Sequence, residues 1–234
     1  MDQWKASKES VKAYDLYMRH QRDGGRLQTE SILRSRVDLG CALEIGPGPG
    51  YEGLEWLMET EDTTLIGLDI SEEMVALARK NARDYGLEKR AEYRVGDAGK
   101  IPYAKGRFDA VFSINSLHEW AQPIKVFDEI ERVLRPGGKY LICDLRRDMN
   151  PLIKYFSILC RSRTQKEIRN GFICSVDASY TLQETTDLLA ETKLEGWKAE
   201  QSSQNIIISG RKEYNAFSAA YAAPARMMPL LLRT

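Results

Sequence analysis

The chain has 234 residues, and its 34 lysines and arginines balance its 34 aspartates and glutamates, so no net charge attracts nucleic acid or a membrane. No apolar run approaches the ~20 residues of a membrane span, and residues 1–10 carry no apolar signal segment, which predicts a cytoplasmic protein without stable membrane insertion. The scattered cysteines form no CxxC pair, which favours reduced thiols and supports no metal site.

After Gly40, short apolar runs alternate with helix-length segments. Ser71 is a good N-cap for one of these helices, because its hydroxyl can accept a free N–H of the first turn, and Gly86 is a good stop. Such alternation predicts a parallel sheet with helices on both faces. The predicted strands are 41–46, 63–70, 91–97, 108–115 and 139–145, and the helices between them are 51–61, 71–86 and 123–134.

The later part of the chain adds a helix and two strands. Thr181 and Glu184 form a capping-box pattern at the start of a helix over 181–192. Strands over 197–203 and 204–212 follow each other too closely for a crossover, so they must be antiparallel. The sequence therefore predicts a doubly wound, Rossmann-like α/β fold with a seven-stranded, mostly parallel sheet and an antiparallel last strand.

Two segments lie outside this alternation. Residues 1–40 are polar with a helical pattern, and residues 146–178 separate the fifth strand from the next helix. Open α/β sheets bind ligands at the carboxyl ends of their strands, which both segments can cover. We therefore expect a helical N-terminal cap over 1–40 and a ligand-binding domain over 41–234 with a lid insertion at 146–178.

The first strand leads into the stretch EIGPGPG, in which Gly46, Gly48 and Gly50 alternate with prolines. Glycine permits positive φ and brings no Cβ into the path of a ligand, and the following helix presents free N–H groups. Three alternating glycines exceed what a plain strand-to-helix turn requires, so a ligand-binding loop is favoured. A dinucleotide motif would place a glycine where Tyr51 stands, and Glu44 suits a cation better than a pyrophosphate.

Carboxylates end the next two predicted strands. Asp69 can accept from both hydroxyls of a ribose, and Asp97 can accept from the amino group of an adenine. Ile70, Met74 and Ala98 offer apolar surface to the adenine ring. Together with the acidic glycine loop, these residues describe a site for a nucleoside that carries an amino-acid tail.

The segments LEIGPGPG, LIGLDIS, VGDAGKIPY, FDAVFSINSLHEW and RVLRPGGKYLICDL resemble, in order, the motifs of class I S-adenosylmethionine-dependent methyltransferases. They are most similar to the small-molecule branch that includes the ubiquinone-biosynthesis type (methyltransferase type 11). The resemblance covers residues 40–145 and implies S-adenosylmethionine as the cofactor and S-adenosylhomocysteine as the product. It implies that the methionine part of the cofactor is surrounded by Glu44, Gly46, Gly48 and Gly50. It also implies that Asp69 holds the ribose hydroxyls and that Asp97 and Ala98 hold the adenine. The segment of Asn115, Ser116 and Leu117 is implied to run alongside the sulfonium.

The implied chemistry needs few protein groups, because the positive sulfur activates the methyl group and alignment with exclusion of water supplies much of the catalysis. His118 follows the fourth strand, and its ordinary pKa of about 6.5 suits a general base if the acceptor must lose a proton. Alternatively, His118 only packs against the cofactor or a helix, and Glu119 is a weaker candidate base. The sequence after Asn115 lacks the Asn-Pro-Pro pattern of enzymes that methylate nucleic-acid amines, so we expect a small-molecule acceptor and no nucleic-acid partner.

The acceptor is expected to bind under the cap and the lid. Arg146 is a candidate for binding an acidic group on the acceptor, unless it pairs with Asp144 or Asp148. The aromatic side chains predicted to form the walls of the acceptor site are Tyr14, Tyr17, Tyr155 and Phe156.

The insertion itself is both apolar and basic. Leu152, Ile153, Phe156 and Leu159 are spaced as one helical stripe among several lysines and arginines. Three interpretations stay open: an amphipathic lid helix with a solvated face, a site for an anionic acceptor, or transient membrane contact for a lipid-like acceptor.

Two other functions are compatible with a sheet of this kind. One is a nicotinamide-dependent oxidoreductase, which Tyr51 and the final hairpin oppose. The other is a protein that binds S-adenosylmethionine as a sensor or regulator without turnover, since so few groups distinguish binding from transfer.

Overall fold

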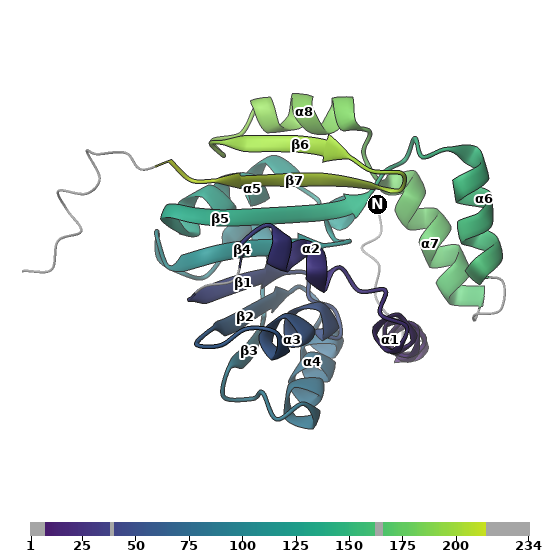
Figure 1. Ribbon diagram of the computed structural model, residues 1–234, viewed down its shortest axis with the longest axis horizontal. Helices are drawn as coiled ribbons and strands as arrows, with labels where there is room; N and C mark the ends of the chain where they lie inside the picture. The colour runs from purple at the N-terminus through teal and green to yellow at the C-terminus, as the bar shows by residue number, and fades with distance from the viewer. Residues whose placement is uncertain (1–7, 38–39, 162–165, 214–234) are drawn as a thin grey trace, which may run out of the picture.

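The computed structural model describes residues 8–37, 40–161 and 166–213 (Figure 1). Residues 1–7 of the predicted cap, 162–165 of the predicted lid and the C-terminal stretch 214–234 lie outside the described residues. The strands are β1 (Cys41–Ile45), β2 (Thr64–Asp69), β3 (Ala91–Val95), β4 (Phe108–Ile114), β5 (Leu134–Leu145), β6 (Trp197–Gln201) and β7 (Asn205–Arg211). The helices are α1 (Lys8–Asp23), α2 (Thr29–Arg34), α3 (Tyr51–Met58), α4 (Glu72–Asp84), α5 (Pro123–Val133), α6 (Pro151–Cys160), α7 (Lys166–Ala178) and α8 (Leu182–Ala190), with short 3-10 helices η1 (Ala98–Lys100) and η2 (Leu117–Glu119).

The strands form one sheet of seven in the order β3-β2-β1-β4-β5-β7-β6. The first five strands of the chain pair in parallel, whereas β7 is antiparallel to both β5 and β6. This confirms the predicted Rossmann-like fold. The strand order reverses between β1 and β4, so their carboxyl ends meet at the point where open α/β sheets bind ligands.

Local sequence signals set the ends of the helices. The hydroxyl of Ser71 accepts the N–H of Met74 at 3.2 Å at the start of α4, and Gly86 beyond the end of α4 has a φ of 70°. Thr181 and Glu184 make both hydrogen bonds of the predicted capping box at the start of α8. These helix ends could be predicted from the sequence, because each depends on residues that lie within a few positions of the helix end.

Strand β5 begins earlier than predicted. The sequence places its start at residue 139, after the RPGG stretch, but the strand runs from Leu134. Leu134 pairs with Phe108, and an irregularity then shifts the register so that Lys139 pairs with Ala110. The proline and glycines are therefore accommodated in a bulge within the strand rather than in a turn before it.

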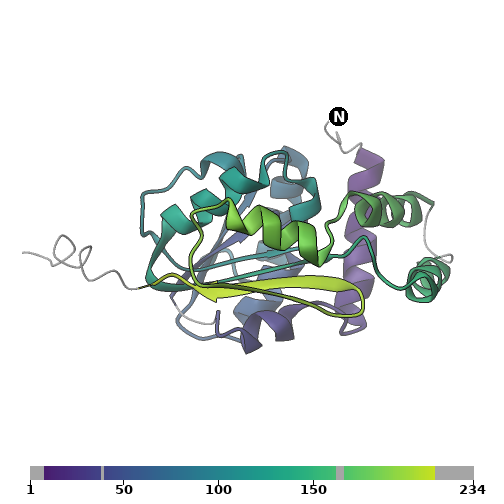
Figure 2. The same ribbon diagram turned by 90° about the horizontal axis from the view of Figure 1, so that it is seen from above.

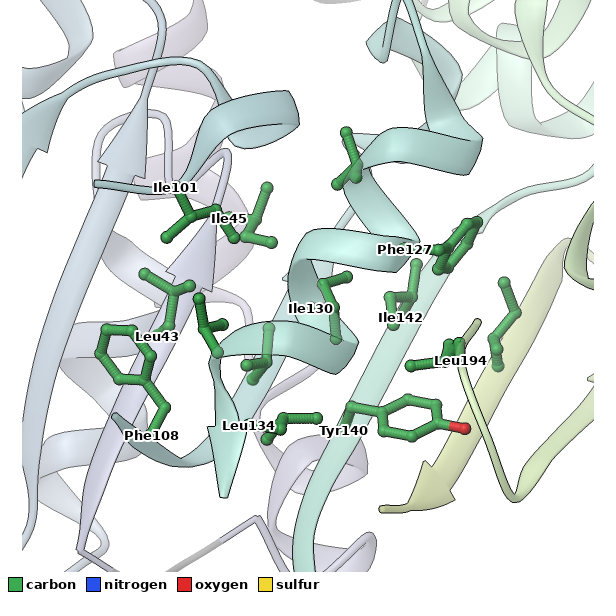
Figure 3. Packing of buried hydrophobic residues seen from close by; sticks show 14 of the residues in the cluster. Leu43, Ile45, Ile101, Phe108, Phe127, Ile130, Leu134, Tyr140, Ile142 and Leu194 are labelled. Atoms are coloured by element: carbon green, nitrogen blue, oxygen red, sulfur yellow. The ribbon is translucent and has the colours of Figure 1, made fainter. Parts of the chain in front are cut away.

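Apolar cores cover both faces of the sheet. Helices α5 and α8 cover one face (Figures 1 and 2), where Phe127 and Ile130 of α5 pack on Leu43 and Ile142 of the strands (Figure 3). Helices α2, α3 and α4 cover the other face, with Trp56 fully buried among them. The two layers hold the strand ends that carry the candidate site residues.

Helices α1, α6 and α7 lie together beyond the carboxyl ends of the parallel strands (Figure 1). Helix α1 contacts α3, α4 and α7, and α7 contacts both η2 and α6. Among the described residues, no helix combines the length and the apolar character needed to cross a membrane.

The exposed face of α6 differs from the expected one. Ile153 packs toward the small core around Phe172 and Val176, but Leu152 and Phe156 expose 67% and 58% of their surface. The interpretation of α6 as an amphipathic helix with a polar, solvated face is therefore wrong, because the face in contact with solvent is apolar.

Candidate cofactor and catalytic site

The glycine loop between β1 and α3 has three residues with positive φ: 66° at Gly46, 53° at Gly48 and 85° at Gly50. A Cβ on Gly46 would lie 2.2 Å from Oγ of Ser116, so glycine is required there for packing. At Gly48 the nearest atom to such a Cβ is Cε1 of Tyr14, at 3.4 Å. The loop therefore presents bare backbone at Gly48, beneath one aromatic ring.

Asp69 at the end of β2 holds this loop in place. Its Oδ2 accepts the N–H of Gly48 at 3.0 Å, and its Oδ1 accepts the N–H of Ser71 at 2.9 Å. Burial raises the pKa of Asp69, although these backbone donors oppose the shift. Each carboxylate oxygen can accept a second hydrogen bond, so Asp69 keeps acceptors for two ribose hydroxyls.

The end of β3 lies beside the end of β2, because the two strands pair in parallel up to Asp69. Asp97 is exposed there and accepts the N–H of Gly99 at 2.8 Å, with Ala98 partly buried next to it. Ile70 exposes 66% of its surface, whereas Met74 is buried. The structure thus gathers an exposed carboxylate and an exposed apolar side chain, as an adenine ring requires.

Glu44 is buried in β1 behind the glycine loop, and its Oε2 has no hydrogen-bond partner. A Cβ at position 53 would lie 2.2 Å from this oxygen, so Gly53 in α3 makes room for it. Burial, and then the negative charges of Glu52 and Asp69, raise the pKa of Glu44 well above its ordinary value. A positive charge bound nearby would favour its ionised form, which fits a cationic ligand.

The segment after β4 passes next to the glycine loop. Asn115 has a φ of 52° and donates its N–H to the carbonyl of Cys143 at 2.8 Å. Ser116 is buried against the loop and accepts from Nε1 of Trp120 at 3.0 Å. Leu117 is buried as well. Of the three predicted residues, Ser116 contacts the glycine loop, Asn115 is bound to β5, and Leu117 lies in the core.

His118 is paired with a buried aspartate. Its Nδ1 lies 2.8 Å from Oδ1 of Asp144, and its backbone N–H donates to Oδ2 of Asp144 at 2.6 Å. The N–H of Leu145 donates to Oδ1 at 2.7 Å, so both carboxylate oxygens are fixed by backbone donors. A carboxylate only accepts, so Nδ1 carries the proton and Nε2 is the basic nitrogen of the neutral ring.

The pairing also sets the basicity of this imidazole. Burial lowers the pKa of His118, but the hydrogen bond and the negative charge of Asp144, helped by Glu119, outweigh that effect and raise it above its ordinary value. Oε1 of Glu119 lies 3.9 Å from Nε2 of His118. The arrangement can take up a proton at Nε2 and stabilise the resulting imidazolium.

Asp144 was missed as a site residue by reasoning from the sequence, which treated it only as a possible partner of Arg146. The available signal was a carboxylate at the end of β5, which pairs with β4 so that Cys143 lies opposite Ile114. That register places Asp144 level with the segment that leads to His118. One sequence does not show which strands are neighbours in the sheet, so the pairing of His118 with Asp144 could not be predicted.

Helix α1 lies over the glycine loop. The hydroxyl of Tyr51 donates to Asp15 at 2.8 Å, which ties the start of α3 to α1. The neighbouring Tyr14 reaches Gly48 with its ring, and burial, followed by the charge of Glu119, raises its pKa. Tyr14 therefore lies between the glycine loop and the segment that carries His118.

Tyr17 connects α1 to the insertion. Its ring centroid lies 6.3 Å from that of Tyr14, and its hydroxyl accepts from Nη2 of Arg161 at 3.0 Å. The Arg161 guanidinium also stacks 3.9 Å over the ring of Phe172 in α7. The end of α6 is thus joined to both α1 and α7.

The other predicted acceptor residues lie elsewhere. Arg146 binds both oxygens of Asp148 at 2.8 and 2.9 Å and donates to the carbonyl of Ser202. Tyr155 and Phe156 expose 61% and 58% of their surface and pair with each other, with ring centroids 5.8 Å apart. Of the predicted acceptor residues, the structure brings Tyr14 and Tyr17 to the site.

The fold and these residues define an α/β protein with a site for a cationic nucleoside at the switch point of the sheet. The buried carboxyl of Glu44 with an unpartnered oxygen, the open backbone at Gly48 and the spare acceptors of Asp69 all fit S-adenosylmethionine. Within the described ranges, no group of three or more His, Cys, Asp or Glu side chains could hold a metal ion.

Comparison with known proteins agrees with this assignment. Residues 43–142 match the family model described as a methyltransferase domain. The chain is 30% identical over 149 residues to a phosphatidylethanolamine N-methyltransferase of Cereibacter sphaeroides, covering 63% of this chain and 71% of that protein. The chain belongs to the S-adenosylmethionine-dependent methyltransferase family, as the sequence motifs predicted.

Two further similarities describe its relatives. The methyltransferase GfsG of Streptomyces halstedii is 30% identical over 183 residues, 74% of this chain, and the chain spans 65% of the length of GfsG. The crystal structure of a Methanococcus maripaludis protein superposes with a TM-score of 0.72 at 23% identity. That superposition covers 92% of this chain and 97% of the other, and it confirms the fold.

Proposed function

We propose that this protein transfers a methyl group from S-adenosylmethionine to an uncharged small-molecule acceptor that loses a proton, with His118 as the general base. The observation that carries this proposal is the His118–Asp144 pair, held beside the segment that adjoins the glycine loop. A histidine that only packed against the cofactor would not need a buried carboxylate to orient it.

The cofactor would bind along the ends of β1, β2, β3 and β4. When bound, S-adenosylmethionine supplies a methyl group activated by its positive sulfur. We assign the methionine part to Glu44, Gly46, Gly48 and Gly50, the ribose to Asp69, the adenine to Ile70, Met74, Asp97 and Ala98, and the surroundings of the sulfonium to Asn115, Ser116 and Leu117.

His118 would remove the proton of the acceptor at Nε2. Asp144 holds the ring in the tautomer with Nδ1 protonated and stabilises the positive charge that forms when Nε2 takes the proton. Because Asp144 acts through His118, it is a positioning residue. A hydroxyl acceptor suits this arrangement, since its oxygen keeps a proton at neutral pH until a base removes it.

The charges around the site favour an uncharged acceptor over an anionic one. Asp69, Glu119 and Asp144 all place carboxylates at or near the strand ends. Two of the basic side chains that might have bound an anion are engaged: Arg146 by Asp148, and Lys154 by Asp177 at 2.8 Å. The role of Arg146 in binding an acidic acceptor is therefore not part of this proposal.

The segments around α1 and around α6 and α7 would enclose the acceptor as cap and lid, with Tyr14 and Tyr17 nearest to the transferred methyl. The balanced charge of the chain supports the absence of a nucleic-acid partner. Cysteines without a CxxC pair fit a cytoplasmic location with reduced thiols. Membership of the family argues against the nicotinamide-dependent alternative.

Two measurements test the proposal. Titration calorimetry should show binding of S-adenosylhomocysteine and none of NAD⁺ or NADP⁺. Incubation with methyl-labelled S-adenosylmethionine and a panel of hydroxylated, amino and carboxylic acceptors should transfer label to hydroxylated ones. Binding without transfer to any acceptor would instead support a sensor without turnover, and preferred transfer to carboxylic acids would contradict the assigned acceptor class.

A further inference from the structure

Helix α6 carries an exposed stripe without a single charged residue. Its solvent-facing positions are 151, 152, 155, 156, 159 and 160, which repeat at the spacing of one helix face. The four large side chains of this stripe expose 67% (Leu152), 61% (Tyr155), 58% (Phe156) and 48% (Leu159) of their surface. We call this set the α6 stripe. It is the reverse of an ordinary surface helix, whose outward face is polar.

The stripe is not required for packing within the described fold. The opposite face of α6 already holds the helix in place, because Ile153 and Ile158 pack on the small core formed with Phe172 and Val176 of α7. Helix α6 lies at the outer edge of the molecule, in contact with α7 (Figure 1). A surface of this kind on a soluble protein usually marks a partner.

The size of the stripe limits what that partner can be. Four side chains exposed by about half to two thirds present roughly 400 Å², given ~150–250 Å² for a large side chain. A stable dimer needs ~800 Å² from each partner, so the stripe alone is too small to hold a second copy. An exposed aromatic and aliphatic helix face of this size is sufficient for a helix that lies in a lipid interface.

The charge next to the stripe points to an anionic surface. Lys166 and Arg169 lie in the first turn of α7, where they flank a single acidic residue, Glu167. Lys166 at the start of α7 is exposed, close in the chain to the end of α6. Basic residues beside an apolar helix face are the pattern that attracts anionic lipid headgroups.

We propose that the α6 stripe seats this protein on anionic lipid bilayers as a reversible, peripheral contact. The proposal does not depend on methyl transfer, although α7 contacts η2, where His118 stands, and Arg161 joins the end of α6 to Tyr17. A bilayer beneath α6 would therefore lie next to the segments that we assign to the acceptor, which favours acceptors dissolved in lipid.

Co-sedimentation with vesicles tests this contact. The wild-type protein should sediment with vesicles of equal parts phosphatidylcholine and phosphatidylglycerol, less with phosphatidylcholine alone, and less again at high salt. The double variant Leu152→Ser, Phe156→Ser should lose at least about tenfold in vesicle affinity, while Met58→Ser, which removes a 57% exposed side chain from α3, should bind as the wild type does.

Both variants should bind S-adenosylhomocysteine normally, which shows that they are folded and separates this test from that of the cofactor. The proposal is overturned if the wild type does not sediment with anionic vesicles, or if the double variant binds them equally well. It is also overturned if light scattering shows a wild-type dimer that the double variant dissociates, since the stripe would then be an interface between copies.

Discussion

Replacing Asp69 by alanine should weaken the binding of S-adenosylhomocysteine by about a hundredfold or more. The carboxylate is proposed to accept both ribose hydroxyls, and a hydrogen bond to a charged group contributes ~1.5–3 kcal/mol. Since ~1.4 kcal/mol corresponds to a factor of ten in affinity, one lost bond gives about tenfold and two give about a hundredfold at the lower limit.

The same substitution removes two acceptors from the protein itself. The N–H groups of Gly48 and Ser71 lose the oxygens that they bind at 3.0 and 2.9 Å. Each such bond to a charged group stabilises the fold by ~1.5–3 kcal/mol, and the removal of a buried carboxylate offsets part of the loss of ~3–6 kcal/mol. We therefore expect the melting temperature to fall by no more than about 24 °C, at ~2–4 °C per kcal/mol for a domain of this size.

Titration calorimetry measures the dissociation constant, and circular dichroism during heating shows whether the variant is folded. Asp84→Ala is the matched control, because Asp84 is an aspartate at the far end of α4 that pairs with Lys80 at the surface. The control should bind as the wild type does. An unchanged dissociation constant in a folded Asp69→Ala protein would refute the assignment of the ribose to Asp69.

Three further changes probe the base, the loop and the lid. His118→Ala should lower kcat by about 10²–10⁴-fold without changing the affinity for S-adenosylhomocysteine. His20→Ala, at the other histidine of the chain, is the control and should change neither quantity. If kcat of the His118→Ala protein equals that of the wild type, the base role is contradicted. Because the base must be neutral and the pKa of His118 is raised, kcat/KM of the wild type should rise with pH through a pKa above 6.5, and the absence of that limb would count against His118. Gly48→Val should abolish cofactor binding while the protein still folds. The backbone of Gly48 has a φ of 53°, and a Cβ there would lie 3.4 Å from the ring of Tyr14, so a branched side chain would fill the space above the loop. Normal binding would show that the loop does not touch the ligand. Hydrogen exchange over 8–23, 151–161 and 166–178 should be faster than in the strands and should slow when S-adenosylhomocysteine binds. If these segments are as protected as the strands and do not respond, the lid hypothesis fails.

Much of the fold was predictable because its signals are local or periodic. The strand–helix alternation, the cap at Ser71 and the capping box at Thr181 depend on residues close together in the chain. The cofactor residues share this advantage, since each lies at the end of a strand that its own apolar run defines. The parallel sheet then brings those ends together at one edge.

The rest depends on contacts between distant segments, which one sequence does not encode in a readable pattern. The pairing of His118 with Asp144 joins η2 to β5 across 26 positions. Which face of α6 is buried depends on the contact with Phe172 of α7. The spacing of Leu152, Ile153 and Phe156 along the helix does not show which of these side chains makes that contact. Arg146 likewise had several possible partners nearby, and only the structure shows that Asp148 binds it.

The position of β7 between β5 and β6 also bears on how the protein is made by the ribosome. One edge of β5 pairs with β4 and the other, from Lys139 to Leu145, pairs with β7, whose residues 205–211 are translated 60 or more positions later. Until they emerge, a strand edge that includes the buried Leu141 and Ile142 is open to pairing with other chains. Nascent chains halted after α8 are therefore expected to aggregate or to hold chaperones, whereas chains that include β7 close the sheet and release them.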